Sequence, residues 1–257
     1  MTILLLILSL LAPERQQIAE DLYIREVDSG VYIVTHEFPW PANSLVVEMD
    51  NGTLVLVDTP YTPEATTELL VWLDDHFGER EMNAINSGFH VDNLGGNAAL
   101  IENDILVYGS SYTVELLEER GEASRKRTLG WLQGGEYETY RLGHEATPYV
   151  GPTHVFELED GLELEIGDET VQIFFPGEAH KPDNVVVYFE GRGLLFGGCM
   201  VLAENGIGNT SDASMHEWAD SIRVLEDFPV QIVVPGHGDR TDTDLLAYTV
   251  ELIEASN

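Results

Sequence analysis

Several residues of metal-binding types stand in four separated segments of the sequence, and each segment also contains glycine or proline. They are His90, Asp92, His180, Cys199 and His237. Imidazole, carboxylate and thiolate groups are the ligands that zinc takes in proteins. Each residue alone has an ordinary structural explanation, such as a satisfied loop histidine or a small buried cysteine. Their coincidence in four segments indicates a metal site built from loops on a rigid scaffold.

These segments follow patterns that are typical of β-strands. Strands are expected near residues 82–86, 171–175, 193–197 and 231–234, and each is followed within a few residues by one of the segments. We therefore expect the five side chains to meet where loops from both halves of the chain converge on one sheet edge.

The remaining elements repeat one theme in both halves of the chain. Further strands are expected at residues 31–34, 44–49, 53–58, 105–108, 162–166 and 184–190, and helices at 62–76, 111–131, 214–228 and 241–255. Strands followed by helices, twice, predict an α/β fold of the αββα sandwich type, with two mixed sheets and helices outside. A length of 257 residues fits one such domain, which we place at residues 19–257.

The chain is strongly acidic. Its 12 lysine and arginine residues stand against 46 aspartate and glutamate residues, for a formal net charge of −34. Such a surface repels nucleic-acid phosphates and anionic lipids, so we expect no nucleic-acid partner and no membrane attachment of the mature domain. Salt screens the mutual repulsion of these charges. The composition therefore favours an acidic, halophilic surface on a protein that works in salty surroundings.

The first residues form an apolar run from Met1 to Ala12 that is too short to span a membrane. This run matches the core of a signal peptide, although the positive charge that usually precedes it is missing. We assign residues 1–18 to a signal peptide or N-terminal segment, and we expect a periplasmic or secreted protein. A misassigned start and an amphipathic first element are the alternatives. Cys199 is the single cysteine, so no disulfide can form within the chain.

The order and spacing of the four segments resemble the metallo-β-lactamase superfamily from about Leu22 to the end of the chain. Asp58 stands where that family keeps a structural aspartate. Most other hydrolases of this fold have a metal-bridging aspartate in place of Cys199 and a histidine in place of Asn93. The cysteine is therefore similar to that of the true β-lactamases with a cysteine ligand. Asn209 lies in a segment that resembles theirs, in which an asparagine faces the β-lactam carbonyl.

The resemblance implies zinc, and it implies that one of two metal sites is incomplete. The residues that match the family's ligands are Asp92, Cys199 and His237 in one site, and His90 and His180 in the other. Gly88 stands where the family has the first histidine of the second site, and glycine cannot bind a metal. We therefore expect one zinc ion in the first site and a second ion that is weak or absent. Glu178 and His36 are candidates to complete its shell.

Because Gly88 replaces the first histidine, the chain shares features with two subclasses of the family. A replaced first histidine and the long helix at 111–131 are similar to the mono-zinc carbapenemases. The other ligands resemble those of the di-zinc, broad-spectrum enzymes. The substitution Gly88→His is accordingly expected to raise the occupancy of a second zinc ion.

Substrate contacts are expected from several places. The family often has a lysine that pairs with the substrate's carboxylate three residues after the cysteine, where this chain has Leu202. Lys181 or Arg240 would supply the cation instead, unless each is a surface charge. Trp40 would cover the substrate with an apolar face, or the loop that carries it is packed structure. Asn209 would polarise the substrate carbonyl, and its neighbours also fit a helix cap.

The resemblance implies hydrolysis of the β-lactam amide bond by a monomer, with carbapenems as one candidate preference. Asp92 or His90 would orient or deprotonate the attacking water. Two other functions stay open. The missing lysine favours hydrolysis of another ester, lactone or thioester, and Gly88 favours a binding or vestigial protein with little turnover.

Overall fold

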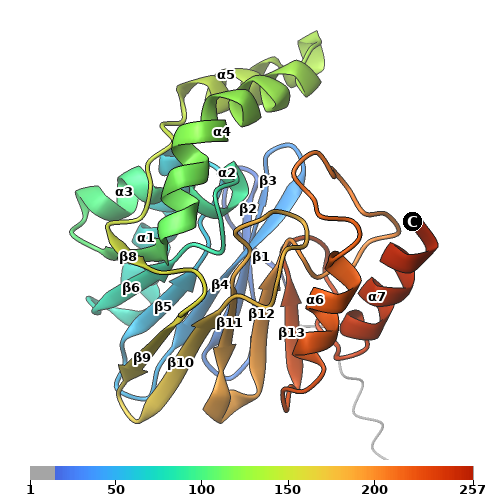
Figure 1. The fold of residues 1–257 in the computed structure, drawn as a ribbon. Helices are drawn as coiled ribbons and strands as arrows, with labels where there is room; N and C mark the ends of the chain where they lie inside the picture. The colour runs from blue at the N-terminus through green and yellow to red at the C-terminus, as the bar shows by residue number, and fades with distance from the viewer. Residues whose placement is uncertain (1–14, 257) are drawn as a thin grey trace, which may run out of the picture.

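The computed structural model describes residues 15–256, and in them two β-sheets pack face to face (Figure 1). The first sheet has its strands in sequence order: β1 (Gln16–Ala19), β2 (Leu22–Asp28), β3 (Val31–Glu37), β4 (Pro41–Glu48), β5 (Leu54–Val57), β6 (Met82–Ile85), β7 (Leu106–Ser110) and β8 (His154–Phe156). Strands β1 to β5 are antiparallel to their neighbours, and β5 to β8 are parallel.

The second sheet has the order β13-β12-β11-β10-β9. Its strands are β9 (Leu162–Ile166), β10 (Glu169–Phe174), β11 (Val186–Phe189), β12 (Leu194–Gly198) and β13 (Ile232–Pro235). The β12–β13 pair is parallel and the other pairs are antiparallel. Both sheets are thus mixed, as the sequence predicts.

Side chains that alternate along the strands build the core. Val31 and Ile33 of β3 lie in the hydrophobic core between the two sheets, whereas Tyr32 and Val34 belong to the cluster on the outer face of the first sheet. Strand β11 alternates in the same way between the central core and a cluster on the outer face of the second sheet. Both faces of the central strands are covered, which explains why their sequences are nearly continuous apolar runs.

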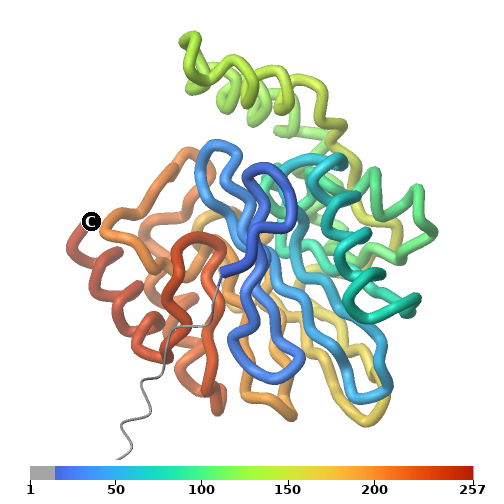
Figure 2. The backbone as a smooth tube through the Cα atoms, turned by 180° about the vertical axis from the view of Figure 1, so that it is seen from behind, coloured from blue at the N-terminus to red at the C-terminus, as the bar shows by residue number. Residues whose placement is uncertain are grey.

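Helices cover the outer faces of both sheets. Helices α1 (Pro63–Phe77) and α3 (Asn97–Glu102) lie on the first sheet, and α6 (Trp218–Leu225) and α7 (Leu245–Ser256) lie on the second (Figure 1). Seen from behind, the N-terminal strands lie between α7 on one side and α1 on the other (Figure 2). This arrangement is the predicted αββα sandwich.

Helix α4 (Ser111–Trp131) begins near the first sheet and extends beyond both sheets, with α5 (Glu138–Ala146) beside it (Figure 1). Its first turn is capped by Ser110, whose hydroxyl accepts a hydrogen bond from the backbone N–H of Thr113 at 3.0 Å. The helix spans the residues that the sequence predicts. Helix α5 and the short 3-10 helix η1 (Gly135–Tyr137) are additions that the sequence pattern did not indicate.

The N-terminal boundary and two helix starts differ from the sequence-based expectation. Residues 1–14 lie outside the described part of the chain, so a signal peptide remains a prediction there. Residues 16–18 belong to β1 and pair with β2, so the folded domain begins before residue 19. Helix α6 occupies only part of the expected 214–228, and α7 begins at Leu245 rather than near 241. No helix in residues 15–256 is long and apolar enough to cross a membrane.

Candidate metal centre

The predicted metal ligands follow strand ends at one edge of the sandwich. Cys199 comes directly after β12, and His237 comes two residues after β13. Because β12 and β13 are parallel neighbours, their carboxyl ends lie side by side, and the N–H of Gly236 donates to the carbonyl of Gly198 at 2.7 Å. Asp92 lies in the short helix α2 (Val91–Leu94), which follows β6 of the other sheet. Both sheets therefore contribute ligands, as expected.

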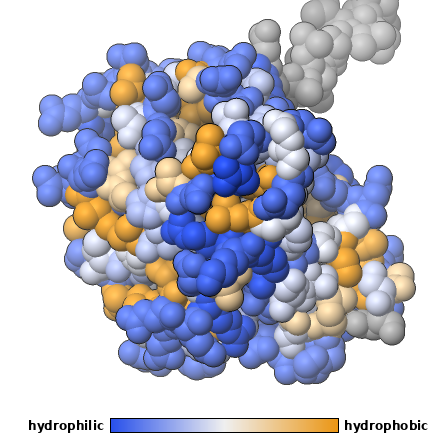
Figure 3. All heavy atoms as spheres, turned by 90° about the horizontal axis from the view of Figure 1, so that it is seen from above, coloured by the Kyte–Doolittle hydropathy of each residue, from blue (hydrophilic) through white to orange (hydrophobic). Residues whose placement is uncertain are grey.

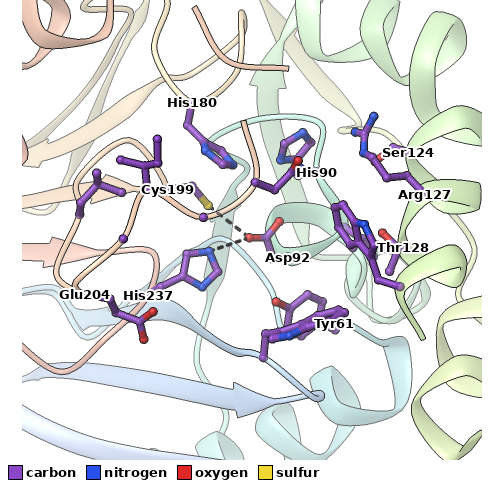
Figure 4. A pocket seen from close by; sticks show the side chains of 18 of the residues that line it. Tyr61, His90, Asp92, Ser124, Arg127, Thr128, His180, Cys199, Glu204 and His237 are labelled. Atoms are coloured by element: carbon purple, nitrogen blue, oxygen red, sulfur yellow. Dashed lines mark hydrogen bonds and ion pairs between the residues drawn. The ribbon is translucent and has the colours of Figure 1, made fainter. Parts of the chain in front are cut away.

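Asp92, Cys199 and His237 bring three donor atoms together. One ligand atom from each of them lies within 4.8 Å of the others. Asp92 Oδ2 lies 3.2 Å from Cys199 Sγ and 3.3 Å from His237 Nε2, and Figure 4 shows all three side chains pointing toward one another. A carboxylate, a thiol and an imidazole at this spacing match the donor set of a tetrahedral zinc site with an open position.

Outer contacts fix the orientation of His237. Its Nδ1 lies 2.7 Å from the carbonyl oxygen of Pro41, and because that oxygen can only accept, Nδ1 carries the proton. Nε2, the atom that faces Asp92, is therefore the nitrogen that a cation would bind. Without a cation, burial lowers the pKa of His237, but hydrogen bonding to Asp92 and Cys199 outweighs it and holds this pKa well above its usual value, so Nε2 then carries a proton as well. The Asn43 amide holds the same loop by donating to the carbonyl of Gly238 at 2.8 Å. Such outer contacts orient metal-binding histidines in proteins.

A buried network under the site holds the loop that carries Asp92. The Asp58 carboxylate accepts hydrogen bonds from the backbone N–H and the hydroxyl of Ser87, both at 2.7 Å, and from the Asn93 amide at 2.9 Å. That amide also lies 3.8 Å from Cys199 Sγ. Asn93 therefore links the structural aspartate to the thiol, and a histidine in its place could not make both contacts in the same way.

The charges of the three donors suit a bound cation. Burial raises the pKa of Asp92, but hydrogen bonding to His237 and the nearby charges of His237 and His90 outweigh it, so this pKa lies well below its usual value. Burial and the Asp92 charge raise the pKa of the Cys199 thiol. The thiol therefore keeps its proton at neutral pH until a cation stabilises the thiolate. The residues present thus fit zinc.

His90 and His180 lie beside this trio but do not join it. Their ring centroids are 5.3 Å apart, and both line the same pocket. His90 Nε2 lies 3.2 Å from Asp212 Oδ2, while His180 Nδ1 is buried without a hydrogen-bond partner among the described residues. Burial lowers the pKa of His180, as does the neighbouring His90, so the ring stays neutral. Asp212 is a site residue that sequence reasoning did not identify.

Four other candidates lie away from the positions expected for them. Lys181 is 1% exposed and does not line the pocket, so it is neither a surface charge nor a contact for substrate. Arg240 is exposed and pairs with Asp242 at 2.8 Å. The His36 ring is buried, and its Nδ1 accepts the backbone N–H of Tyr61 at 3.1 Å. Neither it nor Glu178 lines the pocket, so neither completes a second metal site.

The pocket beside the metal centre has a volume of about 500 Å³, which suits a small molecule. Residues from α4 form one wall and the Leu202–Asn209 loop forms another; the α4 residues are Ser124, Arg127, Thr128 and Trp131. Their spacing of three and four places them on one face of the helix. Figure 4 shows the labelled members of this face opposite Cys199 and Glu204.

Two exposed tryptophans stand at this pocket. Trp40 is 42% exposed and Trp131 is 46% exposed, and their rings meet edge to face at 6.1 Å. Trp40 therefore lines the pocket, as it must if its loop is to cover a substrate; the alternative was that the loop is only packed structure. From above, hydrophilic residues cover most of the molecule and apolar residues lie between them in separate patches (Figure 3).

The two-sheet sandwich with a carboxylate, a thiol and an imidazole at one edge defines a metal-binding αββα protein. Comparison with known proteins identifies its family. The model of the metallo-beta-lactamase superfamily matches residues 38–237, and the chain belongs to that superfamily. A type 2 metallo-β-lactamase of Bacillus cereus is 32% identical over 218 residues, which cover 83% of this chain and 73% of that protein.

Two further relatives extend over more of the chain. The type 2 metallo-β-lactamase of Bacteroides fragilis is 29% identical over 257 residues, covering 95% of this chain and 90% of its own length. The solved structure of a metallo-β-lactamase from Pontibacter korlensis is 27% identical and covers 94% of this chain and 99% of its own, with a TM-score of 0.69. The similarity thus includes both sheets and every segment that carries a candidate ligand.

Proposed function

We propose that this protein hydrolyses the amide bond of β-lactams with one zinc ion held by Asp92, Cys199 and His237. The observation that carries the proposal is the meeting of these three donors at the wall of a pocket of about 500 Å³. The relatives named as metallo-β-lactamases support the substrate class. Zinc, when bound, supplies a Lewis acid for the amide nitrogen, on which negative charge develops as the bond breaks.

His90 serves as the general base, and Asp212 orients it. Asp212 Oδ2 accepts a hydrogen bond from Arg127 at 2.5 Å and lies 3.2 Å from His90 Nε2. Because an ionised carboxylate can only accept, Nε2 carries the proton, and the lone pair of the neutral ring is on Nδ1. Nδ1 can then take a proton from the attacking water, and Asp212 stabilises the charged ring that results.

Asn209 donates a hydrogen bond to the substrate carbonyl. Its side-chain oxygen already accepts from the backbone N–H of Ser211 at 3.1 Å and from the Ser211 hydroxyl at 2.7 Å. These contacts hold the amide so that its N–H groups remain for the pocket, which Asn209 lines. The residue thus serves the local turn and the substrate at once.

Arg127 takes the place of the missing lysine. Among the described residues that line the pocket it is the one lysine or arginine, and Leu202 lines the opposite side. Its hydrogen bond to Asp212 uses one of five N–H donors, so the others remain for the carboxylate of a β-lactam. Trp40 and Trp131 supply the apolar wall. We place the carbapenems first among substrates because the single-ion site is similar to that of the mono-zinc carbapenemases.

The direct test is a substrate panel with metal analysis on the same samples. Zinc-loaded protein is expected to hydrolyse imipenem fastest. Nitrocefin, penicillins and cephalosporins are expected to be hydrolysed more slowly. Turnover of lactones or thioesters with no β-lactam hydrolysis would replace this proposal with the rival hydrolase, which the absence of a lysine at Leu202 favours. No turnover of any substrate by protein that holds zinc would favour a vestigial role.

The proposal also covers the location and the oligomeric state of the enzyme. We place it in the periplasm or outside the cell, supported by the apolar run at Met1–Ala12, and we expect it to act as a monomer. Gel filtration of the mature chain and N-terminal sequencing of the exported protein test these two points. A dimer, or retention of the Met1–Ala12 run on the exported protein, would contradict them.

A further inference from the structure

The side chain that is missing at Gly88 has not left an empty space. A Cβ atom built on Gly88 would lie 1.9 Å from Lys181 Cε and 2.9 Å from Lys181 Cδ. It would also lie 2.9 Å from Asp183 Oδ1. These separations are far below van der Waals contact, so the stem of Lys181 already fills the volume that a side chain at position 88 needs.

The charge of Lys181 lies in an acidic interior. Lys181 is 1% exposed, and Asp183 and Asp58 are buried as completely. The acidic side chains whose charges act on Lys181 include Asp183, Asp58 and Asp92. Asp183 Oδ1 has no hydrogen-bond partner among the described residues, although its Oδ2 accepts from Thr113 at 2.8 Å. A buried carboxylate in this state needs a neighbouring cation.

We propose that Lys181 and Gly88 are a matched pair, in which the lysine supplies the volume of the missing ligand and the positive charge of the second metal ion. The His90–His180 half of the site then excludes a second ion for two reasons. Position 88 offers no donor atom, and a fixed ammonium already balances the acidic groups beneath the site. This inference rests on the proposed function, because it explains why one zinc ion suffices.

The pair changes the expectation for Gly88→His. Sequence reasoning predicts that this substitution alone raises the occupancy of a second ion. The structure indicates that a histidine there collides with Lys181, which is buried and has little room to move. A second ion therefore requires both changes, with a small residue in place of the lysine.

The test compares four proteins: the wild type, G88H, K181T and G88H/K181T. Each protein is dialysed against excess zinc and then against buffer, and the zinc content per chain is measured by mass spectrometry. Visible spectra of cobalt-loaded samples give a second readout of the bound metal. One ion per chain is expected for the first three and two ions for the double variant, with a melting temperature for G88H below that of the wild type. Two ions in the wild type or in G88H, or one ion in G88H/K181T, would overturn the inference.

A charge-neutral variant separates volume from charge. K181M keeps a stem of similar length, so it is expected to bind one ion, but more tightly than the wild type by on the order of tenfold, because a nearby positive charge is gone. Competition with a chromophoric chelator measures this. Unchanged affinity would refute the electrostatic half of the inference. Metal counts do not depend on turnover, so a wild type that binds one zinc but hydrolyses no β-lactam refutes the proposed function and leaves this inference standing.

Discussion

Replacing Asp212 with asparagine tests whether this carboxylate orients the general base. The substitution keeps the shape of the side chain and removes its charge. Asp212 has a side chain that is 7% exposed, and it contacts Arg127 and His90 at once. Hydrogen bonding to His90 lowers the pKa of Asp212 despite burial, and Arg127 adds to this, so the value falls from 3.8 to about 2.

The lowered pKa sets the expected loss of stability. The gap between 3.8 and about 2 corresponds to about 2 kcal/mol of folding free energy at neutral pH. Because the folded-state pKa is the lower one, this contribution is complete above about pH 4 and disappears as the pH falls toward 2. The difference between the variant and its parent is therefore largest at neutral pH, and roughly half of it remains at pH 3.

Two assays check this prediction, with a surface aspartate as the matched control. Urea unfolding of metal-free protein at pH 7 and pH 3 measures stability. Steady-state hydrolysis at constant zinc content measures kcat, which is expected to fall by about 10²-fold because the amide cannot stabilise the charged His90 ring. Asp220 also pairs with an arginine, Arg223 at 2.6 Å, but it is 82% exposed, so Asp220→Asn is expected to change neither quantity. An Asp212→Asn protein with unchanged kcat would refute the orienting role.

Four further predictions follow from the site and the surface. Cys199→Ser should lower zinc affinity by about 10²-fold or more and abolish hydrolysis at low zinc; full activity there would exclude the thiol as a ligand. Arg127→Met should raise KM for substrates with a carboxylate, whereas Arg127→Lys should largely restore it; equal effects on carboxylate esters would contradict the assigned contact. Trp40→Ala should raise KM several-fold with little change in kcat, and an unchanged KM would show that the loop is only packed structure. Because of the net charge of −34, melting temperature should rise between about 0.1 and 1 M salt, and a flat or falling curve would contradict the halophilic interpretation.

The fold could be predicted in most of its parts because its central strands are covered on both faces. Continuous apolar runs such as Leu54–Val57 and Val186–Phe189 report burial directly. Helix α5 was missed because it has little apolar content. It is held by ion pairs of Arg141 with Glu138 and Glu145, and it buries His144. Such exposed pairs are a weak signal in a helix of nine residues, and Gly143 within it lowers the intrinsic helix propensity.

The candidate metal trio could be predicted because Cys199 and His237 closely follow strand ends, Asp92 lies in the segment after another strand, and each has a distinctive chemistry. The contact between Arg127 and Asp212 could not be predicted, because the two residues are 85 positions apart in the sequence and only the folded chain brings them together. The spacing of Ser124, Arg127 and Thr128 on α4 was the one available signal. Lys181 looked like a loop charge because its burial depends on the space left by Gly88, which no local pattern reveals.

The central claim is that a thiolate and an imidazole from parallel neighbouring strands share one zinc ion with a carboxylate from the other sheet. X-ray absorption spectroscopy of protein loaded with one equivalent of zinc tests it most directly. The spectrum should show one sulfur at about 2.3 Å together with nitrogen or oxygen ligands at about 2.0–2.1 Å, and Cys199→Ser should lose the sulfur. A first shell of nitrogen and oxygen alone in the wild type would contradict the account.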